Sequence, residues 1–242
     1  METWRLITTW GAHPAFNMGL DEALLESSES PPTLRFYSWH PDTLSLGYFQ
    51  RFADVPGAER AGAVVRRITG GGAIHHVREL TFSIAAPLAH PLYARPIADS
   101  YTLVHEAIRA ALAEVGVPAQ VRGELDLVSD REGTGMCFHK SSPIDLVWGD
   151  RKGVGSAQRR KGGRVLHHGS IKLGTSPLEG AIATAEEHRP GLEAETFAPI
   201  LRRAFEVGFG IALESTAPSA DERTRAKLLG PRYVDAEFVH RR

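Results

Sequence analysis

Apolar residues recur along this chain at two spacings, one typical of helices and one typical of strands. Where they return every three or four residues, the pattern predicts an amphipathic helix with one buried face. In segment 99–116, for example, Val104, Ile108 and Leu112 share one face, and Gly116 can end the helix. This spacing predicts four helices, over residues 15–28, 99–116, 194–208 and 220–229.

Short apolar runs in the middle of the chain predict strands, which are bounded by glycine and proline turn signals. The glycine-punctuated basic segment 151–163 (RKGVGSAQRRKGG) is expected to be a loop between two of them. Strict alternation of strand and helix is absent, which favours a mixed or antiparallel sheet with helices packed on it. The expected strands cover residues 33–39, 43–49, 64–68, 80–86, 144–148 and 165–173.

Composition changes this picture little. The formal net charge is −1, so the whole-molecule charge favours neither nucleic acid nor an anionic membrane surface as a partner. No apolar run approaches the length of a membrane span, and the first residues lack a basic region followed by an apolar core. We therefore expect a cytoplasmic protein without a signal peptide.

The segment Arg66–Ser83 (RRITGGGAIHHVRELTFS) contains the most informative candidate ligand site. Its three glycines, Gly70–Gly72, follow a strand-like run, and glycine lets a ligand approach the backbone closely. Arg66 and Arg67 suggest a ligand with negative charge. A tight connection between two strands explains the glycines equally well. The segment has no dinucleotide-binding glycine signature, and the chain has no P-loop.

Two adjacent histidine pairs, His75–His76 and His167–His168, lie in strand-like segments. Neighbouring side chains of a strand point to opposite faces, so each pair offers at most one histidine to a given site. No metalloprotease motif and no cluster of cysteine and histidine ligands occurs. We therefore do not expect a metal site.

Cys137 is the only cysteine, so an internal disulfide is excluded. It lies in GTGMCFHKSSPIDL, close to His139 and Lys140, and nearby cationic side chains favour a reactive thiolate. The sequence leaves two interpretations open, a catalytic nucleophile and a buried cysteine that packs beside Phe138.

Lys152 belongs to a run of basic residues from Arg151 to Lys172 that contains no Asp or Glu. A lysine in a partly desolvated pocket can lose its proton near neutral pH or stabilise an anion, whereas most single lysines are solvated at the surface. The whole run is either a solvated face or a docking patch for an acidic partner protein.

These motifs together resemble the biotin/lipoate protein ligase and octanoyltransferase superfamily, over nearly the whole chain. NMGLDEALLE (17–26) resembles the first helix of the family, and TLRFYSWHPDTLSLGYFQ (33–50) resembles its first hairpin. RRITGGGAIHH (66–76) resembles the acyl-binding glycine loop, and DRKGVGSAQRRKGGRVLHHGSI (150–171) resembles the lysine-containing segment. The implied fold is α/β (α+β), with a mixed, largely antiparallel sheet flanked by helices, like the class II synthetase core.

The resemblance also implies functional residues. Cys137 and Lys152 would be catalytic, and no residue would bind a metal. Residues 1–242 are expected to form a single catalytic domain without a C-terminal accessory domain. The implied substrate-binding residues are Arg67, Gly70, Gly71, Gly72, His76, Gly155, Ser156, Ala157, His168 and Gly169.

The stretch after the glycine loop distinguishes branches of the superfamily. ATP-dependent lipoate ligases carry an acid and a Gly-Asn pair there, whereas this chain has HVRELTFS, with Val77 and Leu80 at the acid and amide positions. This stretch and Cys137 resemble the octanoyltransferase branch. One departure is Gly153 after the lysine, where the family has a branched apolar residue, which affects the pose of Lys152.

The leading hypothesis is an acyltransferase of lipoate biosynthesis that moves octanoyl from acyl carrier protein to a lysine of a lipoyl domain or of the glycine cleavage H protein. Cys137 would form a thioester, Lys152 would help to deprotonate it, and the amides of Gly71–Gly72 or those near Lys152 would bind the oxyanion. No cofactor is needed. The expected apolar tunnel is lined by Leu46, Val65, Ile74 and Val154.

Three alternatives remain open. An ATP-dependent lipoate ligase would use ATP and Mg²⁺, with Lys152 neutralising the acyl-adenylate. An amidotransferase would move octanoyl between two lipoyl-type proteins through the same cysteine. A non-catalytic acyl- or carrier-binding protein would need neither Cys137 nor Lys152.

Overall fold

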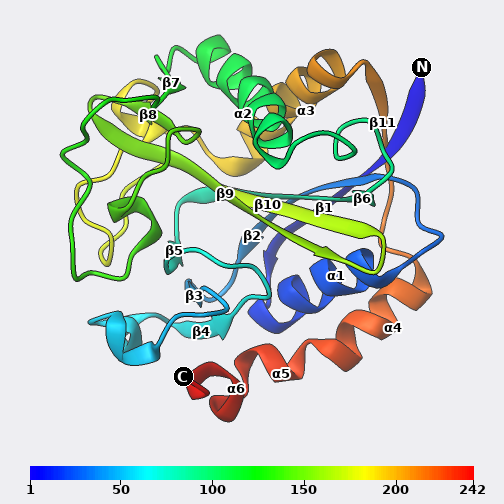
Figure 1. Ribbon diagram of the computed structural model, residues 1–242, viewed down its shortest axis with the longest axis horizontal. Helices are drawn as coiled ribbons and strands as arrows, with labels where there is room; N and C mark the ends of the chain where they lie inside the picture. The colour runs from blue at the N-terminus through cyan, green and yellow to red at the C-terminus, as the bar shows by residue number, and fades with distance from the viewer.

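An eight-stranded sheet runs through the centre of the molecule, in the order β11-β1-β2-β6-β10-β9-β8-β7 (Figure 1). The computed structural model describes residues 1–242. β1 is parallel to β2 and β11, and the other neighbouring pairs are antiparallel, which confirms the predicted mixed sheet. The strands are β1 Glu2–Ala12, β2 Thr33–Trp39, β6 Glu79–Pro87, β7 Gln120–Val121, β8 Leu146–Trp148, β9 Arg151–Lys161, β10 Arg164–Lys172 and β11 Ile211–Ser215.

A second, three-stranded sheet lies beside the first and carries the glycine loop. In it β3 (Thr43–Leu46) is parallel to β4 (Ala63–Arg66) and antiparallel to β5 (Ile74–His76). The expected hairpin over residues 33–50 is therefore wrong, because β2 pairs with β1 and β6 in the large sheet. The turn at His40–Asp42 takes the chain from one sheet to the other.

Helices α2 (Ile97–Glu114) and α3 (Ala194–Phe209) cover one face of the large sheet (Figure 1). The main hydrophobic core fills the space between them, with Val104 and Ile108 from α2 and Phe197 and Phe205 from α3. Burial of this apolar surface is the largest favourable contribution to folding. This face of the sheet is therefore covered by packed helices.

The opposite side is covered by α1 (Pro14–Glu26) and by the C-terminal helices, as Figure 1 shows below the sheet. Because neighbouring side chains of a strand point to opposite faces, each strand supplies apolar side chains to both layers of helices. In β1, Leu6 packs in the main core and Ile7 packs against Leu20 of α1. None of the helices combines the length and apolar character that crossing a membrane requires. The C-terminal helices are α4 Ala220–Leu229, α5 Pro231–Val234 and α6 Ala236–His240.

The four predicted helices are confirmed, with small differences at their ends. α4 coincides with the expected range, whereas α3 continues past Gly208 to Phe209 and is capped by Gly210, a left-handed residue at φ 65°. Short 3-10 helices, which were not predicted, occur in the connections. They are η1 Phe52–Asp54, η2 Ala58–Arg60, η3 Cys137–His139 and η4 Ala185–Glu187.

The basic segment 151–163, expected to be a loop, is mostly strand β9, so that prediction was wrong. β9 pairs with β10 along almost its whole length and with β8 at its start. Its glycines suggested a loop, but pairing on both sides overrides this local preference. Only Gly162 and Gly163, both at positive φ, form a turn. β1, β5, β7 and β11 were also not predicted.

Candidate active site

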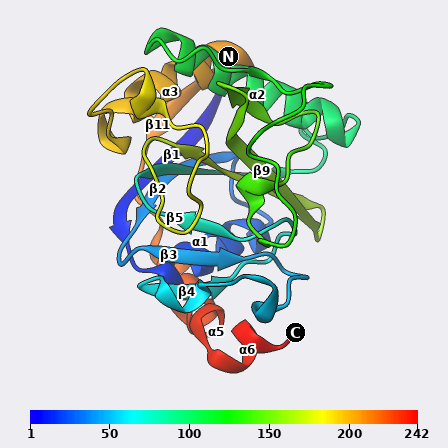
Figure 2. The same ribbon diagram turned by 90° about the vertical axis from the view of Figure 1, so that its left-hand side faces the viewer.

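Cys137 is brought to the glycine loop by backbone hydrogen bonds. It begins η3, within the long loop between β7 and β8, and its amide donates to the carbonyl of Ala73 at 2.7 Å. The Ala73 amide in turn donates to Gly135 at 2.8 Å. This loop and the loop after β10 lie on either side of β5 (Figure 2). The half-buried thiol is therefore fixed beside β5.

Gly72 explains why the glycine loop can approach the cysteine so closely. A methyl group at this position would lie 2.7 Å from the amide nitrogen of Cys137 and 2.8 Å from its Cα. Those distances are far inside van der Waals contact, so any side chain would push the two segments apart. The amides of Gly71 and Gly72 donate no hydrogen bond within the protein, which leaves them available to a ligand oxygen.

The two arginines before the glycine loop hold backbone carbonyls in place. Arg67 donates to the carbonyls of Gly70 and Gly72, both at 2.7 Å, and to Ser45. Arg66 donates to Gly47 and Gln50 and to the C-terminal helix α6 at Val239. Burial lowers the pKa of Arg67 to about 10. Every nitrogen of these guanidinium groups bonds to the protein, whereas the sequence suggested an anionic ligand for them.

Lys152 of β9 points at Cys137 and is almost completely buried. Its Nζ lies 3.7 Å from Sγ of Cys137 and 2.9 Å from Oδ2 of Asp145, and it donates to the carbonyls of Cys137 and Lys140. Burial alone would lower the pKa of Lys152, but the negative charges of Cys137 and Asp145 outweigh burial and raise it above the usual value. The side chain is therefore an ammonium ion at neutral pH.

A β-bulge sets the direction of Lys152. Val147 pairs with Lys152 and Leu146 pairs with Val154, so Gly153 is an extra residue in β9. The indole of Trp148 fills the space beside it, because a methyl group on Gly153 would lie 2.0 Å from the Trp148 ring. Trp148 thus occupies the space that a larger side chain at position 153 would need, and Lys152 still points at Cys137.

Cys137 lies where a narrow cavity meets a wider polar groove. The cavity extends inward between the two sheets, and the groove runs along the cysteine loop through Lys140, Asp145 and Lys152. Gly71, Cys137 and Ser156 border both spaces. The cavity is lined by Met18, Tyr37, Trp39, Ser45, Arg67, Gly70, Gly71, Ile74, His76, Thr81, Cys137, Gly155, Ser156, Ala157, His168 and Gly169.

The structure brings most of the expected substrate-binding residues together around the cavity, whereas most of the expected tunnel residues lie outside it. Of the four expected tunnel residues only Ile74 borders the cavity. Leu46 and Val154 were wrong, because their side chains pack into hydrophobic clusters away from the cavity. Val65 packs in the cluster of Met18, Tyr37 and Trp39 but does not border the cavity itself. Gly72 borders the groove and not the cavity, while the other expected substrate-binding residues all line the cavity.

The inner end of the cavity is closed by Met18, Tyr37 and Trp39, which belong to one buried cluster. The Trp39 indole donates to Thr81 at 2.8 Å and stacks on His76, and the Tyr37 hydroxyl donates to Asp21 at 2.9 Å. Both rings are therefore fixed. Every polar side chain that lines the cavity has a partner in the protein, so the cavity suits a ligand tail that needs no hydrogen bonds.

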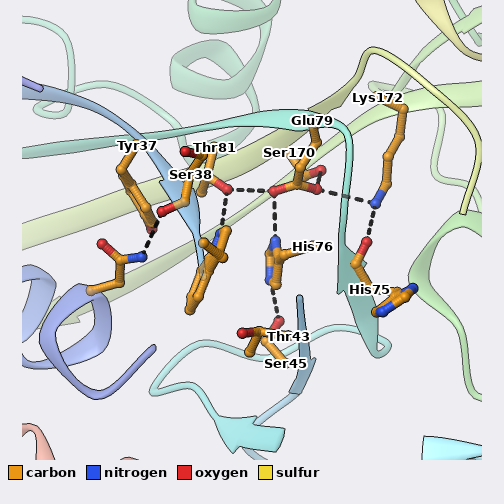
Figure 3. Close-up of polar contacts among 12 residues, drawn as sticks. Tyr37, Ser38, Thr43, Ser45, His75, His76, Glu79, Thr81, Ser170 and Lys172 are labelled. Atoms are coloured by element: carbon orange, nitrogen blue, oxygen red, sulfur yellow. Dashed lines mark hydrogen bonds and ion pairs between the residues drawn. The ribbon is translucent and has the colours of Figure 1, made fainter. Parts of the chain in front are cut away.

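Glu79 binds His76 of the cavity wall and, through Lys172, is linked to Glu179 in the loop after β10. Figure 3 shows the Glu79 carboxylate accepting hydrogen bonds from the side chains of His76, Thr81, Ser170 and Lys172. Lys172 is completely buried and also pairs with Glu179 at 2.8 Å. Burial would raise the pKa of Glu79, but His76 and Lys172 outweigh burial and hold it well below its usual range.

The histidine pairs divide between faces as expected. His168 faces the cavity and contacts Thr69 at 2.6 Å and Asp21 at 3.5 Å, whereas His167 faces α2 and contacts Ser156. His76 contacts Ser45 at 2.8 Å on the cavity side (Figure 3). His75 contacts Asp42 at 2.9 Å. The structure contains no group of three or more His, Cys, Asp or Glu side chains arranged to hold a metal ion.

The basic run does not form one surface patch. Lys152, Arg164 and Lys172 are buried, and Lys161 pairs with Glu26 at 2.9 Å. Arg151 pairs with Glu187 at 2.6 Å. Neither open interpretation, a solvated face or a docking patch, describes the whole run from Arg151 to Lys172, because strand alternation and ion pairs distribute these charges over the interior and several faces.

Asp145 is the main site residue that sequence reasoning missed. It is the only carboxylate between Glu132 and Asp150, in the same segment as Cys137. That isolation was a usable signal, since an acid alone beside a candidate thiol and lysine is a natural partner for the lysine. The residues of the closed end, Met18, Tyr37 and Trp39, gave no such signal because apolar side chains in a helix and a strand predict core.

Known proteins resemble this chain in sequence over most of its length. The family model of the lipoyl protein ligase A/B catalytic domain matches residues 13–189. An octanoyltransferase LipM of Kyrpidia tusciae is 34% identical, and the alignment covers 100% of each chain. An octanoyltransferase LipM of Moorella thermoacetica is 44% identical over 179 residues, 71% of this chain and 66% of the relative.

Solved structures share the fold. A lipoate-protein ligase A bound with ATP superposes with a TM-score of 0.78 at 23% identity, with 99% of each chain covered. The bipartite lipoate protein ligase of Thermoplasma acidophilum gives 0.76 at 20% identity, covering 99% of this chain and 97% of its own. The chain therefore belongs to the lipoyl protein ligase A/B catalytic-domain family, in its octanoyltransferase branch, and is an acyltransferase.

Proposed function

We propose that this protein transfers an octanoyl group from acyl carrier protein to a lysine of a lipoyl domain or of the glycine cleavage H protein, through a thioester on Cys137. The observation that carries the proposal is the position of Cys137 Sγ, 3.7 Å from the Lys152 ammonium and at the junction of cavity and groove. The octanoyl chain occupies the cavity, and the thioester lies at its mouth. The whole chain, residues 1–242, acts as one catalytic domain.

In the first half-reaction the Cys137 thiolate attacks the carbonyl carbon of the octanoyl thioester, and a new carbon–sulfur bond forms. The amides of Gly71 and Gly72 stabilise the oxyanion. The bond to the carrier sulfur then breaks, and the leaving thiolate takes a proton from Lys152. The acyl-enzyme holds a neutral sulfur beside a neutral lysine amine.

In the second half-reaction the neutral amine of the acceptor lysine enters along the groove and attacks the thioester. A carbon–nitrogen bond forms, and the proton of the amine passes to Lys152. The carbon–sulfur bond to Cys137 breaks, and the thiolate is again balanced by the Lys152 ammonium. No cofactor takes part, and substrate-binding roles fall to the residues that line the cavity, including His76, His168, Gly155 and Gly169.

Intact-mass spectrometry tests this proposal directly. Mixing the protein with octanoyl acyl carrier protein should add one octanoyl group, and adding a lipoyl domain should remove that group and octanoylate the domain. Cys137→Ala and Cys137→Ser should carry no thioester. A mass gain that persists in Cys137→Ala would contradict the mechanism.

The same experiment separates the alternatives. Pyrophosphate release that depends on ATP and free lipoate would indicate a lipoate ligase. Acylation by an octanoylated lipoyl-type protein, but not by octanoyl carrier protein, would indicate an amidotransferase. Binding without turnover under all of these conditions would indicate an acyl- or carrier-binding protein.

A further inference from the structure

Asp145 is the carboxylate that pairs with Lys152, and it lies outside the set of residues that contact a substrate carbonyl in the proposed reaction. Its side chain is 6% exposed, and Oδ2 lies 2.9 Å from Nζ of Lys152. The same oxygen accepts a hydrogen bond from the amide of Ser142 at 2.7 Å. The carboxylate is thus held by the loop before β8, whereas the lysine belongs to β9.

The hydrogen-bond partners of Lys152 connect Asp145 with the segment that carries Cys137. An ammonium ion has three N–H donors, and here Asp145 and the carbonyls of Cys137 and Lys140 lie within 3.2 Å. Both carbonyls belong to the short segment that carries the thiol. The sulfur at 3.7 Å is the most distant partner. Lys152 therefore links Asp145 to the cysteine segment.

We propose that Asp145 is a positioning residue, whose carboxylate keeps the Lys152 side chain charged and directed at the Cys137 sulfur. The part of the proposal that concerns acyl transfer rests on the proposed function. The part that concerns the thiol does not, since it follows from the contacts of three side chains.

The charged groups around Lys152 indicate what happens without Asp145. Cys137 faces it from the cysteine loop and Asp145 from the loop before β8, and His105 approaches from α2. Burial lowers the pKa of His105, so its imidazole is neutral at neutral pH and neither repels nor balances the Lys152 ammonium. Without Asp145 only the thiolate opposes the effect of burial, and the proton of Lys152 can move to the sulfur. The site would then hold a thiol and a neutral amine.

Alkylation of the single cysteine measures this directly. The rate of iodoacetamide addition to Cys137, followed by intact mass, should rise with pH in one step in the wild-type protein. In Asp145→Asn the rate at neutral pH should fall about tenfold, and a second rise should occur at alkaline pH, where Lys152 and the thiol have both lost their protons. Asp145→Glu, which keeps the charge, should restore a single step.

Matched variants exclude a purely structural effect. Glu187→Gln removes the carboxylate of the neighbouring ion pair on Arg151 and should leave the alkylation profile unchanged. Asp145→Ser retains an acceptor near the Ser142 amide and replaces Asp145→Asn if that variant does not fold. A one-step profile at the wild-type rate in folded Asp145→Asn or Asp145→Ser overturns the proposal, even if the melting temperature falls.

Acyl transfer provides a second readout. In the same Asp145→Asn protein, octanoyl-enzyme formation should slow in parallel with alkylation. If the wild-type protein forms no octanoyl-enzyme but the alkylation profile changes as expected, the proposed function fails and the role of Asp145 stands. If transfer occurs and the alkylation profile is unchanged, the role of Asp145 fails and the proposed function stands.

Discussion

Single residues set the geometry around the thiol. Gly72 allows the glycine loop to touch the backbone of Cys137, and Gly155 leaves the space in front of the sulfur free. Asp145 and the carbonyls of the cysteine segment then fix the end of Lys152. Each of these contacts makes a separate prediction.

Lys152→Gln should slow octanoyl-enzyme formation by about 10²–10⁴-fold, because the variant lacks the cation that balances the thiolate and the proton for the leaving sulfur. Intact-mass measurement of samples quenched at successive times gives the rate of octanoyl-enzyme formation. The double variant Lys152→Gln with Asp145→Asn controls for the unpaired carboxylate that the single change leaves buried. A wild-type rate in either variant would show that Lys152 takes no part in the reaction.

Gly155→Ala should abolish acylation while the protein stays folded. The new methyl group would lie 2.8 Å from Cε of Lys152, 3.1 Å from its Nζ and 3.7 Å from Sγ of Cys137. It would displace the lysine from the sulfur and occupy the space of the reacting carbonyl. Acyl-enzyme yield and melting temperature are measured together, with Gly208→Ala, at an exposed position of α3 without positive φ, as a control for replacement of a glycine. Acylation at the wild-type rate would mean that the carbonyl binds elsewhere.

At the scale of elements, the sequence was informative where periodicity is strong. Helix α4 matches its predicted range, and α1 to α3 match within a few residues, because their apolar faces repeat over many turns. β5, with only three residues, has too little pattern to detect. β9 was misread because its glycines and cations are typical of loops, although Gly153 and Gly155 are small because Trp148 and Lys152 occupy the adjacent space.

Helix α1 places Met18 at the closed end of the cavity, beside two rings fixed by hydrogen bonds. Met18 makes no hydrogen bond and is flexible, so it is the adjustable part of that wall. Met18→Ala should raise the rate with dodecanoyl carrier protein relative to octanoyl carrier protein at least about tenfold, because the cavity lengthens. Competition between the two donors, read by intact mass, measures the ratio.

Leu20→Ala is the matched control for this prediction. Leu20 lies on the same helix but packs in the cluster with Ile7 and Ala85, away from the cavity. It should lower stability by about 2–5 kcal/mol without changing the chain-length ratio. Equal ratios in Met18→Ala and in the wild-type protein would show that another residue limits the length of the acyl chain.

At the scale of the whole molecule, the site exists only because two sheets and two loops meet. The motifs identified the contributing segments, but they could not show that Cys137 and Lys152 touch. That contact depends on the bulge at Gly153 and on the pairing of Ala73 with the cysteine loop, neither of which has a sequence signature. The buried charges that connect the sheets and loops could not be predicted either, because Glu79 lies far in sequence from Lys172 and Glu179.

These buried charges predict how stability depends on pH. The pKa of Glu79 is held well below its usual range, so its ionised form stabilises the folded state fully above the unfolded-state pKa. That contribution declines as the pH falls toward the folded-state pKa. Glu79→Gln should therefore lower the free energy of unfolding by about 3–5 kcal/mol at neutral pH, because Lys172 loses one of its two carboxylate partners.

The difference in free energy of unfolding between wild type and Glu79→Gln should shrink in acid, because protonation of wild-type Glu79 removes the charge that stabilises the folded state. Urea unfolding of both proteins at neutral pH and below the usual carboxyl range measures the two differences in free energy. Glu195→Gln, at an exposed carboxylate in the first turn of α3, should show no comparable dependence. A difference between wild type and Glu79→Gln that stays constant as the pH falls would mean that Glu79 is not held ionised by His76 and Lys172.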